Sequence, residues 1–328
     1  MKAAIVALAL LAAAPAPAAT EPTVLRYSIQ HDLVVKDLPA NAKSVRVWFW
    51  FPPDTREQKV LDVGVREAPL GTRITRESHY GNRYLYAESN GPAPLKLSTE
   101  FSLERHVVSI PLDPAKAGPL TPWHRALFAD DLNRVVPNME VTPAMQQLAD
   151  QLCGSETNVV KQARALYDYI VKGTSHYSKP GGPKSSQRGS AEYCLANKGG
   201  ACTDMHALFI ALARARGIPT RLHFGSRLQA KNEGKDHDPG YRCWVEYFVP
   251  GYGWVPTDLA AANTDDTRVD FYFSGLDCRR LEFAEGRNLD LEPHQSGGPL
   301  NLLIIAYVEV DGKPWSTFER HVKFTIQP

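Results

Sequence analysis

The pattern of apolar and polar positions divides the chain into a β-rich beginning, a helical middle and a β-rich end. In the first part, short runs of β-branched and aromatic residues are separated by turn residues, which is typical of strands. The clearest runs cover residues 27–30, 44–50 and 83–86. We therefore expect a β-sandwich-like domain over residues 20–112, with the aromatic residues 48–50 in its core.

Three helices are predicted in the middle of the chain. Thr142 and Pro143 suit the N-cap and first position of a helix that ends near Cys153. A second helix, over residues 158–172, has apolar residues at helical spacing. The third, over residues 202–216, follows two glycines and is ended by a glycine and a nearby proline. Short strands are expected after it, over residues 220–224, 241–248 and 253–255.

Proline and glycine mark the segments between these elements. Residues 113–140 begin with a proline-rich stretch and are expected to form a linker, and residues 178–190 an exposed loop. A C-terminal β extension over residues 266–328 is expected to pack on the other domains. Within it, two apolar segments, 302–310 and 316–326, flank an Asp-Gly pair, which predicts a β-hairpin.

The N-terminus resembles an export signal. Lys2 is followed by an apolar run over residues 3–14, and small residues at Ala16 and Ala18 suit cleavage near position 18. The run is shorter than the ~20 apolar residues that a membrane-spanning helix needs. We expect a signal peptide over residues 1–18, no membrane insertion after its cleavage, and a mature protein that is exported to the periplasm or the extracellular space.

The charge balance restricts the partners of the mature chain. The sequence has 37 Lys and Arg against 36 Asp and Glu, a formal net charge of +1. This balance offers no basic surface for nucleic acid and no polybasic segment for a membrane. The sequence indicates neither a cofactor nor an oligomeric state.

Five cysteines remain after the signal segment. An odd number in an oxidising compartment leaves at least one thiol unpaired, and the spacings contain no C-x-x-C metal or redox motif. The remaining four allow up to two disulfides, whose pairing stays open among Cys153, Cys194, Cys243 and Cys278.

Cys202 is the strongest candidate for chemistry. It lies in the first turn of the third predicted helix, directly behind Gly199, Gly200 and Ala201. Unpaired N–H groups and the helix dipole stabilise a thiolate at this position, and the thiolate is the nucleophilic form of cysteine. From position alone, a buried apolar cysteine or half of a disulfide is an equally good interpretation.

The sequence around Cys202 favours the nucleophile. It resembles the nucleophile helix of the transglutaminase-like superfamily, and a second segment resembles that family's histidine strand, turn and aspartate strand. The matching segments are G-G-A-C-T-D-M-H-A-L-F (199–209), R-A-R-G-I-P-T-R (214–221) and C-W-V-E-Y-F-V-P-G-Y-G-W-V-P-T-D (243–258). Two later segments, G-R-N-L (286–289) and Y-V-E-V-D-G (307–312), are similar to the tail of bacterial exported members.

The resemblance implies an α+β fold with a papain-like, transglutaminase-like core over residues 141–265. It also implies papain-like chemistry, in which a Cys thiolate attacks an amide, a His moves the proton and an Asp orients the His. Cys202 matches the nucleophile and Asp258 the aspartate. The substrate would be a peptide or protein, in amide hydrolysis or acyl transfer.

The histidine of the family pattern is replaced. Arg242 stands two residues before Trp244, at the position of the His. Arginine stays charged at accessible pH and cannot act as a base. It is expected to lower the pKa of Cys202 by proximity and to pair with Asp258. Because general acid–base catalysis contributes ~10²–10⁴-fold in rate, amide turnover should be weakened.

Three other histidines are candidates to replace the base. His237 lies in the loop before the strand, His223 on the preceding strand and His206 one helical turn beyond Cys202. A solvated or structural role is the preferred interpretation for each, because catalytic geometry tolerates little displacement. His237 is retained as the substitute base to test.

The remaining residues near these motifs have structural or binding interpretations. Trp244 and Trp254 are expected to line the substrate site or the core. Cys243 should point away from the face of Arg242, and a core or disulfide role is preferred to a second nucleophile. The Asp-His-Asp triplet at residues 236–238 is interpreted as a solvated turn, so no metal site is expected.

Two classes of function remain open. The leading hypothesis is an exported transglutaminase-like enzyme that uses Cys202 on peptide or protein amides and is impaired by Arg242. The alternative is a catalytically inactive pseudoenzyme that binds a peptide or a partner in the same cleft. A structural envelope protein would explain the β-rich beginning but not the helix of Cys202.

Overall fold

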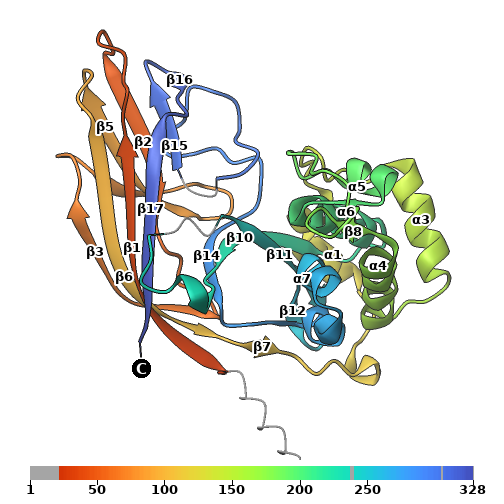
Figure 1. Cartoon of the computed structure of the whole chain (residues 1–328). Coiled ribbons are helices and arrows are strands. Elements are labelled where there is room, and N and C mark those ends of the chain that lie inside the picture. The colour runs from red at the N-terminus through yellow and green to blue at the C-terminus, as the bar shows by residue number, and fades with distance from the viewer. Residues whose placement is uncertain (1–21, 237–239, 304–305, 328) are drawn as a thin grey trace, which may run out of the picture.

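The computed structural model describes residues 22–236, 240–303 and 306–327. The expected signal peptide and His237 therefore lie outside the described residues. Figure 1 shows a β-sandwich beside a mixed helical and sheet domain, with strands β10 and β11 between the two parts. The α+β class predicted from the sequence is confirmed.

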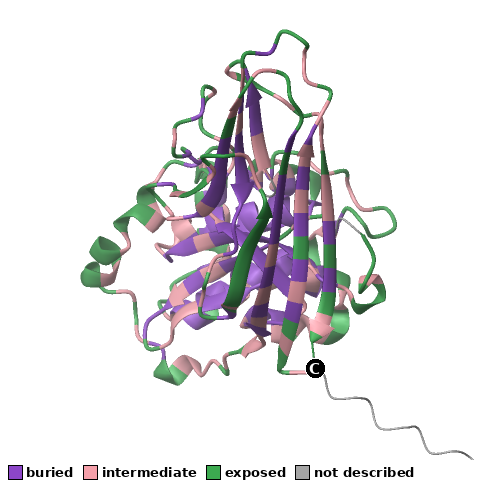
Figure 2. Ribbon diagram, turned by 90° about the vertical axis from the view of Figure 1, so that its left-hand side faces the viewer, coloured by how far each residue is buried: buried purple, intermediate pink, exposed green. Residues whose placement is uncertain are grey.

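Two antiparallel sheets form the sandwich. The first sheet contains β17 (Phe318–Gln327), β1 (Val24–Val35), β6 (Leu95–His106) and β3 (Gln58–Glu67), in that order. The second contains β16 (Lys313–Pro314), β15 (Ala306–Val310), β2 (Ser44–Trp50), β5 (Arg83–Asn90) and β4 (Arg73–Arg76). Alternating residues of both sheets face inward and form an apolar core between them, as Figure 2 shows by the purple stripes along the strands.

The C-terminal hairpin predicted from the sequence forms around the Asp-Gly turn, but its second strand is only the two residues of β16. The longer segment that was expected to complete the hairpin, β17, crosses to the other sheet and pairs with β1. Pro314 has no N–H to continue the ladder, and the Asp311 carboxylate instead accepts hydrogen bonds from the N–H groups of Lys43 and Ser44. The C-terminal segment therefore completes both sheets of the sandwich.

A third sheet supports the helices. Its strands are β12 (Gly253–Thr257), β11 (Arg242–Val249), β10 (Thr220–Arg227) and β14 (Arg280–Glu285), all antiparallel. Strand β14 comes from the segment that the sequence assigned to the C-terminal extension. One face of the sheet packs on the sandwich, and the other faces the helices.

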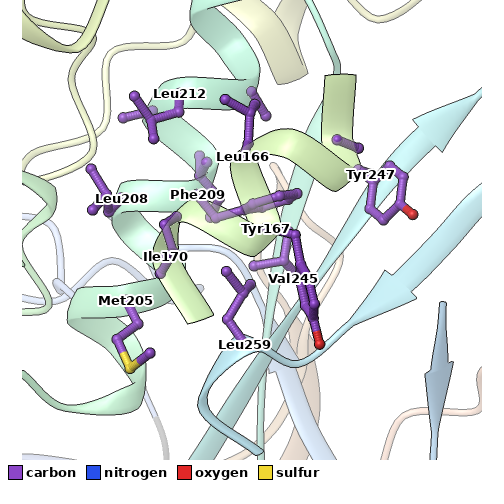
Figure 3. Packing of buried hydrophobic residues seen from close by; sticks show 14 of the residues in the cluster. Leu166, Tyr167, Ile170, Met205, Leu208, Phe209, Leu212, Val245, Tyr247 and Leu259 are labelled. Carbon is purple, nitrogen blue, oxygen red and sulfur yellow. The ribbon is translucent and has the colours of Figure 1, made fainter. Parts of the chain in front are cut away.

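The predicted helices are present with their caps. They are α3 (Pro143–Cys153), α4 (Val159–Gly173) and α6 (Cys202–Ala215). Three shorter helices accompany them: α5 (Ala191–Asn197), α7 (Leu259–Thr264) and α8 (Val269–Phe273). The side chains of Thr142 and Asn158 cap α3 and α4. Figure 3 shows apolar residues of α4, α6 and β11 that meet in one core, among them Leu166, Phe209 and Val245.

Shorter elements complete the fold. The segment expected to be a linker contains a 3₁₀ turn (Pro114–Lys116), α1 (Pro122–Leu127) and α2 (Ala129–Asn133). Strands β7 (Val108–Ser109) and β13 (Gly275–Leu276) pair antiparallel, and β8 (Ser175–His176) pairs parallel with β9 (Gly199–Gly200).

Trp50 joins the sandwich to the third sheet. Its side chain is 1% exposed and its ring packs edge-on against Phe101 of the sandwich and Phe283 of β14, with centroids 5.4 and 4.5 Å away. The indole Nε1–H donates to the Phe283 carbonyl oxygen at 2.5 Å. The expected core role of the aromatic run is therefore observed.

We expect Trp50→Ala to lower the free energy of unfolding by ~3–5 kcal/mol, because it removes a large buried ring at the junction of two layers. Urea denaturation followed by circular dichroism measures the change. Trp123→Ala is the matched control, since Trp123 is 65% exposed, and it should change stability by less than about 0.5 kcal/mol. Equal effects of the two substitutions would contradict the assigned role.

Candidate active site

Helix α6 is buried on all sides, from Cys202 to Ala213. It packs against α3, α4, α5 and α7 and against strands β10 and β11. A helix that is surrounded in this way must satisfy each of its polar side chains inside the protein. Those internal contacts build the candidate site.

Two glycines allow another segment to lie against the start of α6. Gly199 and Gly200 have φ angles of +144° and +148°, which favour glycine. A Cβ at Gly199 would collide with the Ser175 carbonyl oxygen, and one at Gly200 would collide with the Asp204 carboxylate. The glycines thus permit the parallel pairing of β8 with β9 directly before Cys202.

Cys202 has the environment of a thiolate. A hydrogen bond from Cys243 lowers the pKa of Cys202 well below its usual value, against the effect of burial, and contacts with His176 and His206 lower it further. Burial and the neighbouring Cys202 raise the pKa of Cys243, so Cys243 is the protonated donor of the pair. Cys202 is 5% exposed and Cys243 is fully buried.

His206 contacts the Cys243 member of this pair. The Leu259 N–H donates to His206 Nε2 at 3.1 Å, and His206 Nδ1 lies 3.1 Å from Cys243 Sγ. Thr203 Oγ1 lies 3.5 Å from Cys243 Sγ and 3.9 Å from Cys202 Sγ. The hydrogen bonds thus run from the Leu259 backbone through His206 and Cys243 to Cys202.

Cys243 therefore lies in the core, as expected, but also directly beside Cys202. The thiols of Cys153, Cys194, Cys202 and Cys243 are all free in the structure, and the Cys278 thiol donates to the Pro22 carbonyl oxygen at 3.2 Å. Cys153, Cys194 and Cys243, for which the sequence left disulfides open, therefore form no disulfide with one another in the structure.

His176 was missed in the sequence. Its ring is one of the groups that lower the pKa of Cys202, and its backbone pairs with Gly200 in the parallel bridge of β8 and β9. The ring Nδ1 lies 2.7 Å from Ser178 Oγ, and the backbone N–H donates to Asn263 Oδ1 at 2.8 Å. The Gly-Gly pair before Cys202 was the available signal, because such glycines mark a close approach of another backbone segment.

Asp258 caps α7 and is paired with Arg280. Its Oδ1 accepts from the Ala261 N–H at 2.8 Å, and its Oδ2 lies 2.6 Å from the Arg280 guanidinium. Burial raises the pKa of Asp258, but Arg280 and His206 together hold it well below its usual value. Asp258 Oδ1 lies 3.4 Å from His206 Nε2, so the carboxylate is within the site but at its inner end.

The expected pairing of Arg242 with Asp258 is wrong. Arg242 is exposed and its guanidinium donates to the Tyr241 carbonyl oxygen at 2.8 Å. Successive residues of a strand point to opposite faces, so Arg242 lies away from the face on which Cys243 meets Cys202. The cation that neutralises Asp258 is Arg280, which comes from β14.

Trp244, Trp254 and His223 do not contact the nucleophile. Trp244 stacks on His223, with centroids 6.1 Å apart and planes 5° apart, on the face of β11 opposite Cys243. His223 lies 3.2 Å from Glu246 and 3.1 Å from Glu282, and these carboxylates raise its pKa well above the usual value despite burial. The three residues line a 280 Å³ pocket on that face. Of the solvated and structural roles considered for His223, the structure shows the structural one, an ion pair with Glu246 and Glu282.

The loop over residues 178–190 is held against the start of α6. Asp204 accepts hydrogen bonds from the N–H groups of Ala201 and Ser190, both at 2.8 Å. Arg287 is fully buried and donates to the Gly189 carbonyl oxygen at 2.7 Å. These contacts fix the surroundings of Cys202.

In the part of the chain that the structure describes, no cluster of three or more His, Cys, Asp or Glu side chains is arranged to hold a metal. The same residues include no helix that is long and apolar enough to cross a membrane.

We expect Arg280→Met to destabilise the protein by ~3–5 kcal/mol at neutral pH, because it leaves the buried Asp258 without its cation. The loss should shrink as the pH falls, because without Arg280 burial raises the pKa of Asp258 and the folded variant protonates this carboxyl, whereas the folded wild type keeps it charged. Urea denaturation at several pH values measures both effects. Arg242→Met is the control and should cost less than about 0.5 kcal/mol; a larger loss there would restore the expected Arg242–Asp258 pair.

Comparison with known proteins shows which family and which relatives the chain is similar to. Residues 146–259 match the model of the transglutaminase-like superfamily. An uncharacterized protein of Haemophilus influenzae is 24% identical over 337 residues, which cover 92% of this chain and 89% of the relative.

Two solved structures are similar at low identity. The crystal structure of a candidate cysteine protease from Cytophaga hutchinsonii has a TM-score of 0.61 at 17% identity, over 94% of this chain and 92% of that chain. The periplasmic domain of TgpA from Pseudomonas aeruginosa has a TM-score of 0.35 at 16% identity, over 77% of this chain and 92% of that domain. A TM-score of this size supports no argument about this chain. The family match and the fold agree on the central part of the chain: residues 146–259, which include Cys202, form a domain of the transglutaminase-like superfamily.

Proposed function

We propose that this chain is an exported cysteine enzyme that acts on the amides of peptides or proteins through Cys202, by hydrolysis or by acyl transfer to an amine. The observation that carries the proposal is the thiolate environment of Cys202 at the N-terminus of α6. Export is proposed from the N-terminal sequence, with its Lys2, apolar run and small residues near position 18.

The proposed reaction begins with attack of the Cys202 thiolate on the amide carbon. The N–H groups of Cys202 and Thr203 head the helix and have no acceptor within it, so they are placed to stabilise the oxyanion. The C–N bond then breaks, the amine leaves with a proton, and a thioester forms on Cys202. Water or an amine cleaves the thioester and restores the thiolate.

Cys243 and His206 hold the thiolate before substrate arrives. Hydrogen bonds to the charged form of a thiol favour that form, and Cys243 donates one to Cys202. His206 is fully buried, so it acts through Cys243 rather than on the substrate. Both are positioning residues in this proposal.

A second candidate function is peptide binding without turnover. It is favoured by Arg242, which stands at the motif position of the base and cannot accept a proton. In that case the cleft would hold an extended peptide or a partner segment, and Cys202 would contribute contact rather than chemistry.

Turnover of a generic protein separates the two candidates. We expect wild-type protein to cleave β-casein or to attach a fluorescent primary amine to it, and Cys202→Ala to lose both activities, with mass spectrometry locating the products. If neither protein turns casein over but both bind its peptides equally, the enzyme proposal is wrong and the binding function is supported.

The pH dependence of alkylation tests the thiolate itself. Cys202 and Cys153 have similar exposure, 5% and 7%, but burial raises the pKa of Cys153 whereas the pKa of Cys202 is lowered. Between about pH 8.5 and about pH 6, iodoacetamide labelling of Cys153 should fall about 100-fold or more, while that of Cys202 changes little, because only the thiolate reacts. Quantitative peptide mass spectrometry measures both sites in one sample; parallel falls would contradict the thiolate.

A further inference from the structure

The proposed reaction needs a group that moves a proton at Cys202, and the motif position for it is occupied by Arg242. The leaving amine must be protonated and the attacking water must lose a proton. An arginine side chain keeps its protons at neutral pH, and Arg242 points away from the face of Cys243 and Cys202.

The other candidate histidines are committed elsewhere. His206 uses both ring nitrogens, one with the Leu259 N–H and one with Cys243, and is fully buried. His223 lies on the opposite face of the sheet between Glu246 and Glu282. His237 lies outside the described residues.

His176 is placed differently. It is near enough to Cys202 to lower the pKa of that thiol, and it is 8% exposed, whereas His206 is fully buried. Its backbone is fixed on three sides, by the parallel pairing with Gly200, by Asn263 Oδ1 and by the Tyr177 N–H that donates to the Gly200 carbonyl oxygen at 2.8 Å. These contacts hold the backbone of His176 beside Gly200, two residues before Cys202.

Ser178 allows the ring to change its protonation state. Its hydroxyl lies 2.7 Å from His176 Nδ1, so that Nε2 is the ring nitrogen left for proton transfer at Cys202. A hydroxyl both donates and accepts. It can therefore donate to Nδ1 of the neutral ring, and accept from Nδ1–H of the imidazolium after a rotation about its own C–O bond.

We propose that His176 is the general acid and base for Cys202, in place of the residue replaced by Arg242; this inference rests on the proposed function. In acylation, the imidazolium gives its Nε2 proton to the leaving nitrogen as the C–N bond breaks and the C–S bond remains. In hydrolysis, the neutral ring takes a proton from water as its oxygen attacks the thioester. The C–S bond then breaks, and the thiolate and the imidazolium are restored.

A pair of substrates with one acyl group tests this role. The casein peptide that acylates Cys202 most rapidly is prepared as its amide and as its 4-nitrophenyl ester, whose leaving group departs without a proton. We expect His176→Gln to slow single-turnover acylation by the amide ~10²–10⁴-fold, and by the ester less than about tenfold. His79→Gln is the matched control, because His79 is exposed and lies in the sandwich domain, and it should leave both rates unchanged.

The outcomes are distinct. An unchanged amide rate in His176→Gln, with Cys202-dependent turnover intact, overturns the role of His176 and leaves the proposed function in place. Equal losses on amide and ester also overturn it, since they indicate a structural role. Absence of any Cys202-dependent turnover in the wild type overturns the proposed function itself. A smaller loss in Ser178→Ala, confined to the amide, would add support for the hydroxyl as the partner of Nδ1.

Discussion

The burial of helix α6 on every side is the constraint on which the rest of the structure depends. Twelve consecutive residues, Cys202 to Ala213, are buried, and three of them, Thr203, Asp204 and His206, carry polar groups. Each polar group must find a partner inside the protein, because an unsatisfied one costs about 1–3 kcal/mol. Asp204 therefore binds the preceding loop, and His206 binds Cys243 and the Leu259 backbone. The hydrogen bonds that satisfy these buried polar groups also build the site around Cys202.

The sequence predicted the helical part well because its signals are local. Thr142 and Asn158 cap their helices, and the spacing of apolar residues defines the buried faces of α4 and α6. The C-terminal strands failed because pairing between distant segments has no local signal. The Asp-Gly turn was recognised correctly, but the partner of the following strand is β1, almost 300 residues earlier, and only the tertiary structure decides that.

The candidate site was predicted in part for the same reason. Cys202 and Asp258 were found from motifs. In the structure Asp258 lies 3.4 Å from His206, which in turn contacts Cys243 beside Cys202. His176 and Arg280 were not found, since each enters the site through a strand pairing, of β8 with β9 and of β14 with β10. Arg242 was placed beside Asp258 on spacing alone. The strand geometry directs it to solvent, and the buried carboxylate is neutralised by Arg280 instead.

The replacement of the motif histidine by Arg242 shows that three requirements of a thiolate site can be met by different residues: a lowered thiol pKa, proton transfer and an oriented imidazole. Lowering the pKa of Cys202 requires hydrogen-bond donors and the helix N-terminus, and Cys243 and α6 supply them without any residue at position 242. Moving a proton requires a titratable ring at the surface edge of the sulfur, and His176 is the described histidine with that placement. Orienting the supporting imidazole of His206 requires a fixed partner, and the Leu259 backbone N–H supplies one by donating to Nε2. A change at the motif histidine therefore removes one contributor to proton transfer while the thiolate, which depends on other contacts, persists.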